Sequence, residues 1–222
     1  MLIKGILFDL DGVIVDTLHY HFLAWKEMFG RMGGKVQELT VLLHEGRSSK
    51  ELMPILLEEA GLEFPKEKWD NFIETKREYY RSIVNVTFYP QVIETITKLK
   101  KSGYKLALIT ACAKKNMHKA LSDEHQSLFD VIVTGDDMPR GKPNPDPYEI
   151  GRDKLKLKNG ECLVVENAPL GILSAKAAGI TCAAVSTTLP KKYLQKADIF
   201  LNHIEDIFKY LVSVRKVRIR RR

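Results

Sequence analysis

Two carboxylates separated by a single residue carry the strongest chemical signal in this sequence. Asp9 and Asp11 follow the apolar run 3–8, and Gly12 comes directly after them. Neighbouring carboxylates in different environments can hold different protonation states, so that one attacks as a nucleophile while the other donates a proton. Asp9 is therefore the candidate nucleophile and Asp11 the candidate general acid and base. The alternative is a turn at the end of a strand with two solvated acids.

Three further segments hold residues suited to phosphate or metal chemistry. Thr110 follows the apolar run 105–109, where a hydroxyl and the next amide groups suit phosphate oxygens, although a threonine there more commonly caps a helix. Lys142 lies in the proline-rich loop GKPNPDP, where it either neutralises a carboxylate and a phosphoryl group or faces solvent. Glu166 and Asn167 follow the run CLVV, and their oxygen atoms suit Mg²⁺.

Short apolar runs and helical patterns alternate along most of the chain. The predicted strands are 3–8, 105–109, 131–133, 162–165, 181–185 and 199–201. The predicted helices are 91–101, 114–121, 147–155, 169–178 and 204–211, with Gly103, Gly160 and Gly179 at helix ends. This alternation predicts an α/β fold, a Rossmann-like three-layer core with a parallel sheet. The four chemical segments then lie at the carboxyl ends of strands, where such sheets bind ligands.

One long stretch interrupts the alternation. Between residues 17 and 87 no strand pattern occurs, and apolar residues recur at helical spacing, as in His21, Trp25 and Met28. We therefore predict an inserted all-helical cap domain. The predicted division is an α/β core domain of residues 1–16 and 88–211, a helical cap domain of residues 17–87 and a basic tail of residues 212–222.

Composition limits the remaining classes of function. The hydrophobic fraction is 45% and the charged fraction 28%, values that are ordinary for a globular protein with a buried core. No apolar run approaches the roughly 20 residues that span a membrane, the start of the sequence lacks the pattern of a secretion signal, and the three cysteines match no zinc motif. We therefore expect a cytoplasmic protein.

The net charge of +7 is concentrated in the tail 212–222, whose six basic residues account for nearly all of it. The tail alternates apolar and basic residues, so it could pair as an edge strand, bind nucleic acid or anionic lipid, or stay solvated. The competing class of function is a polyanion-binding protein on a catalytically idle fold. The four chemical segments argue against a fold without catalytic activity. Nucleic acid is therefore expected as a partner only through the tail.

The order of aspartate pair, threonine, lysine and acidic pair at successive strand ends resembles the haloacid dehalogenase-like superfamily. The segment DLDGVIVDTLHYHFLAWK resembles its β-phosphoglucomutase-like branch, which has a helical cap. The resemblance covers residues 3–211. It implies a monomeric, Mg²⁺-dependent phosphatase that acts on a small phosphorylated metabolite through an aspartyl phosphate. It also implies that Thr110 and the amide group of Ala111 hold the phosphoryl group and that Lys142 steadies the nucleophile.

The resemblance further implies a set of metal ligands. These are Asp9, the backbone carbonyl of Asp11, Glu166 and Asn167. The family usually has aspartate at the position of Asn167, and the amide removes one negative charge. Glu45, in the cap sequence HEGR, is expected to compensate by reaching the metal.

Three cap residues are candidates for substrate binding. His21 is either a packed core histidine or a residue of cap closure. The segment YHF that contains it resembles the mutases, and this favours a mutase. Lys76 either contacts substrate phosphate or lies on a solvated helix face. Arg47 stands in a cap loop that lacks the serine-arginine pair of the mutases, so we favour a phosphatase over a β-phosphoglucomutase. Sugar phosphates, phosphoglycolate-like acids, nucleotides and pyrophosphate all fit as substrates, which makes inorganic pyrophosphatase a further alternative.

Overall fold

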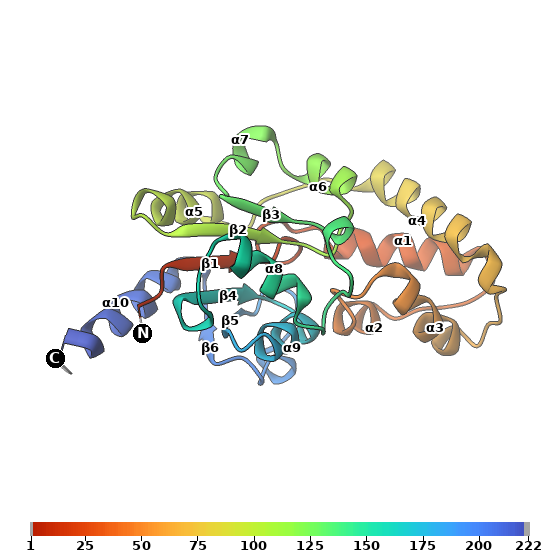
Figure 1. The fold of residues 1–222 in the computed structure, drawn as a ribbon. Coiled ribbons are helices and arrows are strands. Elements are labelled where there is room, and N and C mark those ends of the chain that lie inside the picture. The colour runs from red at the N-terminus through yellow and green to blue at the C-terminus, as the bar shows by residue number, and fades with distance from the viewer. Residues whose placement is uncertain (1, 220–222) are drawn as a thin grey trace.

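A parallel β-sheet forms the centre of the molecule (Figure 1). The computed structural model describes the backbone of residues 2–219 and the side chains of residues 2–214. Within that part, six parallel strands lie in the order β3-β2-β1-β4-β5-β6. They are β1 (Gly5–Phe8), β2 (Lys105–Ile109), β3 (Val131–Val133), β4 (Cys162–Glu166), β5 (Thr181–Val185) and β6 (Ile199–Leu201). This strand order is that of a Rossmann-like fold and confirms the α/β class predicted from the sequence.

Helices cover both faces of this sheet. They are α5 (Val92–Lys101), α6 (Lys114–Ala120), α7 (Asp123–Gln126), α8 (Asp146–Lys154), α9 (Pro169–Ala177) and α10 (Ile207–Ile219). Alternate residues of a strand point to opposite faces, so in β1 Ile6 and Phe8 pack on the face covered by α5 and α10, whereas Leu7 packs against α8 and α9. All four residues of β1 are buried, as expected for a strand covered on both faces.

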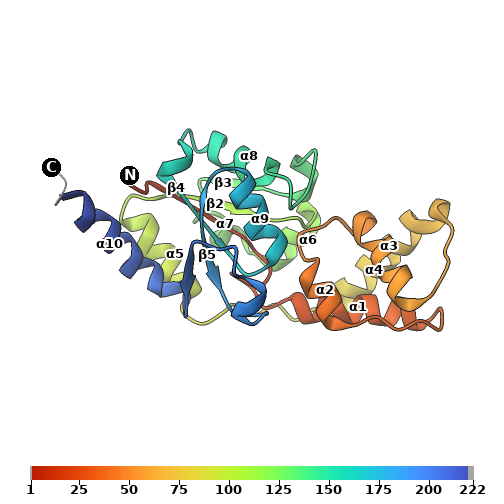
Figure 2. The same cartoon turned by 90° about the horizontal axis from the view of Figure 1, so that it is seen from below.

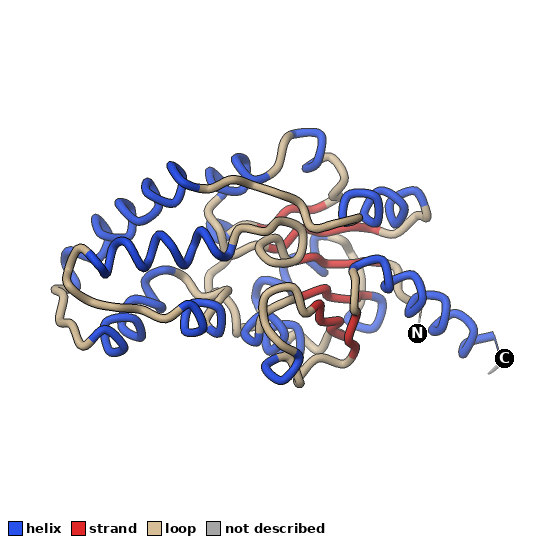
Figure 3. The backbone as a smooth tube through the Cα atoms, turned by 180° about the vertical axis from the view of Figure 1, so that it is seen from behind, coloured by secondary structure: helices blue, strands red, loops and turns tan. Residues whose placement is uncertain are grey.

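Four helices that precede β2 pack against one another at one end of the sheet (Figures 2 and 3). They are α1 (Leu18–Gly30), α2 (Glu38–Leu43), α3 (Ser49–Ala60) and α4 (Trp69–Ile83). Their apolar sides form a separate buried cluster that includes Trp25, Phe29, Leu56 and Phe72. Between residues 17 and 87 the described backbone contains no strand of the sheet, which agrees with the helical pattern of the sequence.

Two chain segments connect the sheet with these four helices, and they run side by side. Val15 and Phe88 form an antiparallel bridge. The Asp16 amide donates to Thr87 O at 2.8 Å, and the Tyr89 amide donates to Ile14 O at 3.1 Å. The domain boundaries at residues 16–17 and 87–88 stay a prediction, and we propose this paired crossing as the place where they lie.

Two expectations about helix ends and the tail are wrong. The sequence predicts that Gly160 ends the helix α8. Lys156 ends it instead, with a φ of 58° that lies in the left-handed region. The edge strand considered for the tail does not form over residues 212–219, because α10 continues as a helix to Ile219. Its first turns are anchored by the buried residues Ile207 and Leu211, and the Arg and Lys residues that follow favour the helix intrinsically. The last three residues, 220–222, lie outside the described part.

None of the helices between residues 2 and 219 is long and apolar enough to cross a membrane.

Candidate active site

Three polar residues meet where neighbouring strands end. Asp9 follows β1, Thr110 follows β2, and Glu166 ends β4. Because β1 lies between β2 and β4 and all three strands are parallel, their carboxyl ends lie side by side at one edge of the sheet. Asp9, Thr110 and Glu166 are all almost completely buried. The sheet therefore assembles the predicted residues from positions far apart in the sequence.

Lys142 joins two of these residues. Its Nζ donates to Asp9 Oδ1 at 2.6 Å and to Glu166 Oε1 at 2.6 Å, and the side chain is 1% exposed. Burial disfavours the ammonium, but Asp9 and Glu166 outweigh it and raise the pKa of Lys142 well above its usual range. The lysine is therefore a fixed positive charge beside the candidate nucleophile, and the alternative of a lysine that faces solvent is wrong.

The environment of Asp9 opposes its ionisation in the absence of a further cation. Burial raises the pKa of the Asp9 carboxyl to about 8, even though Lys142 lowers it. Glu166 and Asp11 raise the pKa further by repulsion. A cation bound at this place would favour the ionised form, which a nucleophile needs.

Asp11 points toward the helical part of the molecule. Thr17 donates a hydrogen bond from its hydroxyl to Asp11 Oδ1, and His21 Nε2 lies 3.8 Å from the same oxygen. Burial raises the pKa of the Asp11 carboxyl, although the Thr17 hydrogen bond, Lys142 and Lys76 each lower it. A raised pKa favours the protonated form of the carboxyl, which is the form that a general acid needs.

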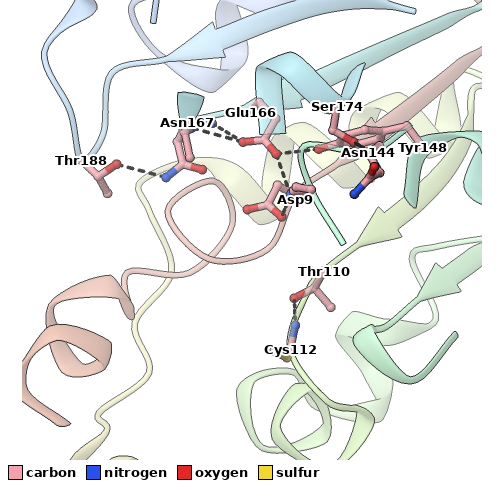
Figure 4. Close-up of polar contacts among 11 residues, drawn as sticks. Asp9, Thr110, Cys112, Asn144, Tyr148, Glu166, Asn167, Ser174 and Thr188 are labelled. Carbon is pink, nitrogen blue, oxygen red and sulfur yellow. Dashed lines mark hydrogen bonds and ion pairs between the residues drawn. The ribbon is translucent and has the colours of Figure 1, made fainter. Parts of the chain in front are cut away.

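Glu166 is held in place on both of its oxygens (Figure 4). The Tyr148 hydroxyl donates to Oε1 at 2.6 Å, and the amides of Asn167 and Ala168 donate to Oε2 at 2.9 and 3.2 Å. Tyr148 is fully buried. Sequence reasoning placed Tyr148 on a helix and missed this contact, because no local pattern shows which strand a helical side chain will meet.

Several buried oxygen atoms fit a divalent cation. Asp9 Oδ2, Asn167 Oδ1 and Glu45 Oε2 are buried and have no hydrogen-bond partner among the described residues. Carboxylate oxygens of Asp9, Glu45 and Glu166 lie within 4.8 Å of one another. Carboxylate and amide oxygens are the ligands that Mg²⁺ prefers, so the predicted metal residues fit the ion. Because both Glu166 oxygens already accept hydrogen bonds, Asp9, Asn167 and Glu45 fit it best.

The position of Asn167 depends on a glycine. The Asn167 amide nitrogen donates to Thr188 Oγ1 at 3.0 Å, which leaves the amide oxygen as the free end. Gly12 has a φ of 84°, and a Cβ atom at this position would lie 2.0 Å from Asn167 Nδ2. Any larger residue at position 12 would therefore be strained and would displace Asn167.

Thr110 lies across the site from Glu166, next to Cys112 (Figure 4). Its hydroxyl accepts a hydrogen bond from the Cys112 amide at 3.1 Å. The following helix α6 has Ala113 at its N-cap, so Thr110 does not cap that helix. Burial raises the pKa of the Cys112 thiol well above its usual range, which keeps it protonated.

A cavity of about 220 Å³ lies between the sheet and the four helices. Its lining includes six predicted site residues, namely Asp11, His21, Glu45, Arg47, Lys76 and Ala111. Lys76 is 3% exposed, so its prediction as part of a solvated helix face is wrong. The face of α4 that carries it packs against α1, where Lys76 Nζ lies 5.0 Å from the centre of the Trp25 ring.

The helical part closes over the buried residues. A Cβ atom on Gly46 would lie 2.8 Å from Lys142 Cδ, so this loop touches the lysine directly. Burial raises the pKa of Glu45 well above its usual range, and nearby Asp9 adds to the effect. The loop of residues 45–47 therefore places one acidic side chain, Glu45, and one basic side chain, Arg47, at the cavity.

Comparison with known proteins identifies the family. The family model of haloacid dehalogenase-like hydrolases matches residues 6–185. Hexitol phosphatase A of Escherichia coli (strain K12) is 30% identical over 206 residues, which cover 92% of this chain and 93% of that protein. Pyrophosphatase PpaX of Bacillus cereus (strain G9842) is 28% identical over 225 residues, which cover 97% of this chain and 100% of that protein.

A solved structure agrees with these sequence relatives. The structure of β-phosphoglucomutase from Clostridium difficile matches with a TM-score of 0.83 and 25% identity, covering 98% of this chain and 99% of that chain. The family match spans most of the chain and includes the carboxyl ends of β1, β2 and β4, which carry Asp9, Thr110 and Glu166. The chain therefore belongs to the family of haloacid dehalogenase-like hydrolases.

Proposed function

We propose that this hydrolase is a Mg²⁺-dependent phosphatase that acts on a small phosphorylated metabolite through an aspartyl phosphate at Asp9. The observation that carries the proposal is the pair of buried carboxyls with different partners. Asp9 is paired with the ammonium of Lys142 at 2.6 Å, whereas Asp11 is bonded to a hydroxyl. This difference supports a nucleophile at Asp9 and a proton donor at Asp11.

In the first step, a carboxylate oxygen of Asp9 attacks the phosphorus atom of the substrate. The bond between phosphorus and the leaving oxygen breaks, and that oxygen takes its electron pair and the proton of Asp11. Lys142 offsets the negative charge of Asp9 and of the phosphoryl oxygens. Thr110 and the Ala111 amide hold the phosphoryl group on the opposite side.

In the second step, a water molecule attacks the phosphorus atom of the aspartyl phosphate. Asp11, now ionised, accepts a proton from that water, and the Asp9 carboxylate is released together with inorganic phosphate. The same residue therefore serves as acid and then as base. The His21 ring, 3.8 Å from Asp11 Oδ1, and Thr17 keep the Asp11 carboxyl oriented in both steps.

Asp9, Asn167 and Glu45 would hold Mg²⁺, with Glu166 beside them and the backbone carbonyl of Asp11 as a further ligand. When bound, the ion supplies positive charge that stabilises the ionised nucleophile and the phosphoryl oxygens. The free oxygens of Asp9, Asn167 and Glu45 support this set. Glu45 then supplies the charge that asparagine at position 167 removes.

A β-phosphoglucomutase is the second candidate. The structural likeness to the Clostridium difficile mutase favours it, together with His21 beside Asp11. A mutase would transfer the phosphoryl group to a sugar instead of to water. The cap loop carries Glu45, Gly46 and Arg47 where the mutase branch has its serine-arginine pair, and this supports the phosphatase.

The experiment is an activity panel with Mg²⁺. Sugar phosphates, hexitol phosphates, pyrophosphate and β-glucose 1-phosphate are supplied in turn, and phosphate release is measured beside sugar-phosphate isomerisation. Release that disappears with EDTA and in Asp9→Asn supports the phosphatase. Isomerisation with little release would establish the mutase, and neither activity across the panel would refute both.

A further inference from the structure

Two polar side chains stand together at the carboxyl end of β4, and they differ in how their oxygen atoms are used. Glu166 accepts hydrogen bonds from Lys142 and Tyr148 at Oε1, both at 2.6 Å, and from two backbone amides at Oε2. Asn167 Oδ1 is buried and has no hydrogen-bond partner within residues 2–214. The amide oxygen of Asn167 is therefore the open oxygen that this strand end brings to the proposed metal site.

An asparagine at this position sets a condition that an aspartate does not. Either oxygen of a carboxylate can bind a cation, whereas an amide has one oxygen and one nitrogen that carries two hydrogens. Mg²⁺ binds oxygen ligands and is repelled by those hydrogens, so the amide is a ligand in one of its two orientations. Asn167 therefore needs a partner that holds its nitrogen away from the ion.

Thr188 is that partner. Asn167 Nδ2 donates to Thr188 Oγ1 at 3.0 Å, and this is the one hydrogen bond of the amide nitrogen in the described part of the chain. Figure 4 shows the nitrogen pointing to Thr188 and the oxygen on the side of Asp9. Because Asn167 is 0% exposed, solvent does not offer the nitrogen another acceptor.

The loop that carries Thr188 is anchored on both sides of this residue. It follows β5, the strand that pairs with β4 in the sheet. The Thr187 hydroxyl donates to Gly12 O, and the Leu189 side chain is buried. The hydroxyl of Thr188 is therefore held beside Asn167 by the fold.

A threonine hydroxyl can accept or donate a hydrogen bond, so the cation decides between two arrangements. In the reverse orientation the hydroxyl would donate to the amide oxygen, and the amide nitrogen would face Asp9. A cation beside Asp9 opposes that orientation. With the oxygen turned to the cation, the buried nitrogen requires an acceptor, and Thr188 provides it. Valine at this position would leave the nitrogen without an acceptor in the metal-bound form, which would lower the affinity for the ion.

We infer that Thr188 is a positioning residue of the metal site, which turns the amide oxygen of Asn167 toward Mg²⁺. The inference rests on the metal ligands of the proposed function and adds a residue that acts through one of them. Thr188 touches neither the nucleophile nor the general acid among the contacts of the described residues. Its hydroxyl therefore sets the affinity for Mg²⁺, and a high Mg²⁺ concentration should compensate for its loss.

The first test measures binding of the metal alone. Mg²⁺ is titrated calorimetrically into the metal-free wild type, Thr188→Val, Thr188→Ala and Thr188→Ser, after thermal melting has shown that each variant folds. Thr188→Val and Thr188→Ala should weaken Mg²⁺ binding about 10-fold or more, as for loss of a group that orients a metal ligand. Thr188→Ser keeps the hydroxyl and should keep the wild-type affinity.

The control is Thr181→Val, the same change at the amino end of β5 and so at the opposite edge of the sheet. It should bind Mg²⁺ as the wild type does. A second measurement follows phosphate release from a substrate of the activity panel at increasing Mg²⁺ concentration. Thr188→Val should need about 10-fold more Mg²⁺ for half-maximal activity and reach a kcat close to that of the wild type.

Asn167→Leu separates failure of this inference from failure of the proposed function. Weaker Mg²⁺ binding in Asn167→Leu, together with unchanged binding in Thr188→Val, overturns the positioning role and leaves the proposed function intact. A loss in Thr188→Ser as large as that in Thr188→Val also overturns it, because the hydroxyl is then not the cause. Unchanged binding in Asn167→Leu removes Asn167 from the metal site and the inference with it. A wild type that neither binds Mg²⁺ nor hydrolyses any compound of the panel overturns both.

Discussion

Nζ of Lys142 lies 2.6 Å from Oδ1 of Asp9, although 133 positions separate the two residues in the sequence. The same ammonium lies 2.6 Å from Glu166 Oε1. One lysine therefore offsets two buried carboxylates, and the site depends on it both for its stability and for the charge of the candidate nucleophile.

Replacement of Lys142 by methionine should destabilise the protein strongly. Removing one partner of a buried ion pair leaves an uncompensated charge and costs about 3–5 kcal/mol. Urea unfolding of Lys142→Met measures the loss. The control is Lys100→Met, which breaks the exposed pair with Asp130 and should cost about 1 kcal/mol or less. Equal losses in the two variants would contradict the account of the buried pair.

The Tyr148 hydroxyl should contribute to stability through Glu166. Tyr148→Phe keeps the ring but leaves Glu166 Oε1 without one of its two donors, and we expect a loss of about 1–3 kcal/mol. Tyr89→Phe is the matched control, because the Tyr89 hydroxyl donates to Asp16 at an exposed place. The expectation fails when thermal or urea unfolding gives the same small loss for both variants.

Lys76 should make stability depend on pH in a defined window. Burial, with added repulsion from Arg77, lowers the pKa of Lys76 to about 7 in the folded protein, whereas an unfolded lysine has a pKa of about 10.4. Between these values the unfolded chain binds the extra proton, so the wild type gains stability as the pH rises from 7 to 10. Lys76→Met lacks this gain.

The measurement is the free energy of unfolding of both proteins across that range. The value for Lys76→Met minus that for the wild type should fall by a few kcal/mol between pH 7 and 10, at about 1.4 kcal/mol for each pKa unit. Below pH 7 the difference should be constant. A difference that does not change with pH would show that Lys76 has an ordinary pKa.

Glu45 should affect the requirement for Mg²⁺. Glu45→Gln keeps the shape of the side chain but removes its charge from the neighbourhood of Asp9 and Glu166. We expect the Mg²⁺ concentration for half-maximal activity to rise about 10-fold or more. Glu38→Gln, which changes an exposed cap residue paired with His19, serves as the control. An unchanged Mg²⁺ requirement in Glu45→Gln would remove Glu45 from the metal site.

The central part of the site follows from one rule about parallel sheets. Asp9, Thr110 and Glu166 each stand at the end of a strongly apolar run, and parallel strands end at the same edge. Apolar runs are readable in the sequence because strands covered on both faces contain few polar residues. The fold class and the meeting of these three residues could therefore be predicted without the structure.

Contacts that depend on how helices pack could not be predicted in this way. Tyr148 meets Glu166 and Lys76 meets Trp25 only after α8 and α4 have docked against their neighbours. A lysine on an amphipathic helix is ordinarily solvated, so its burial is a property of the packed cap. The helical continuation of the tail has the same origin, because Ile207 and Leu211 anchor α10 on the sheet.

The most direct test of the central claim asks whether Asp9 carries the phosphoryl group during turnover. The enzyme is mixed with Mg²⁺ and a substrate found in the activity panel, quenched in acid and reduced with borohydride, which converts an aspartyl phosphate to homoserine. Peptide mass spectrometry then identifies the residue at position 9 as aspartate or homoserine. The account predicts homoserine at position 9 in the wild type when substrate and Mg²⁺ are both present, and none in Asp9→Asn. Continued turnover without any modification of position 9 would contradict it.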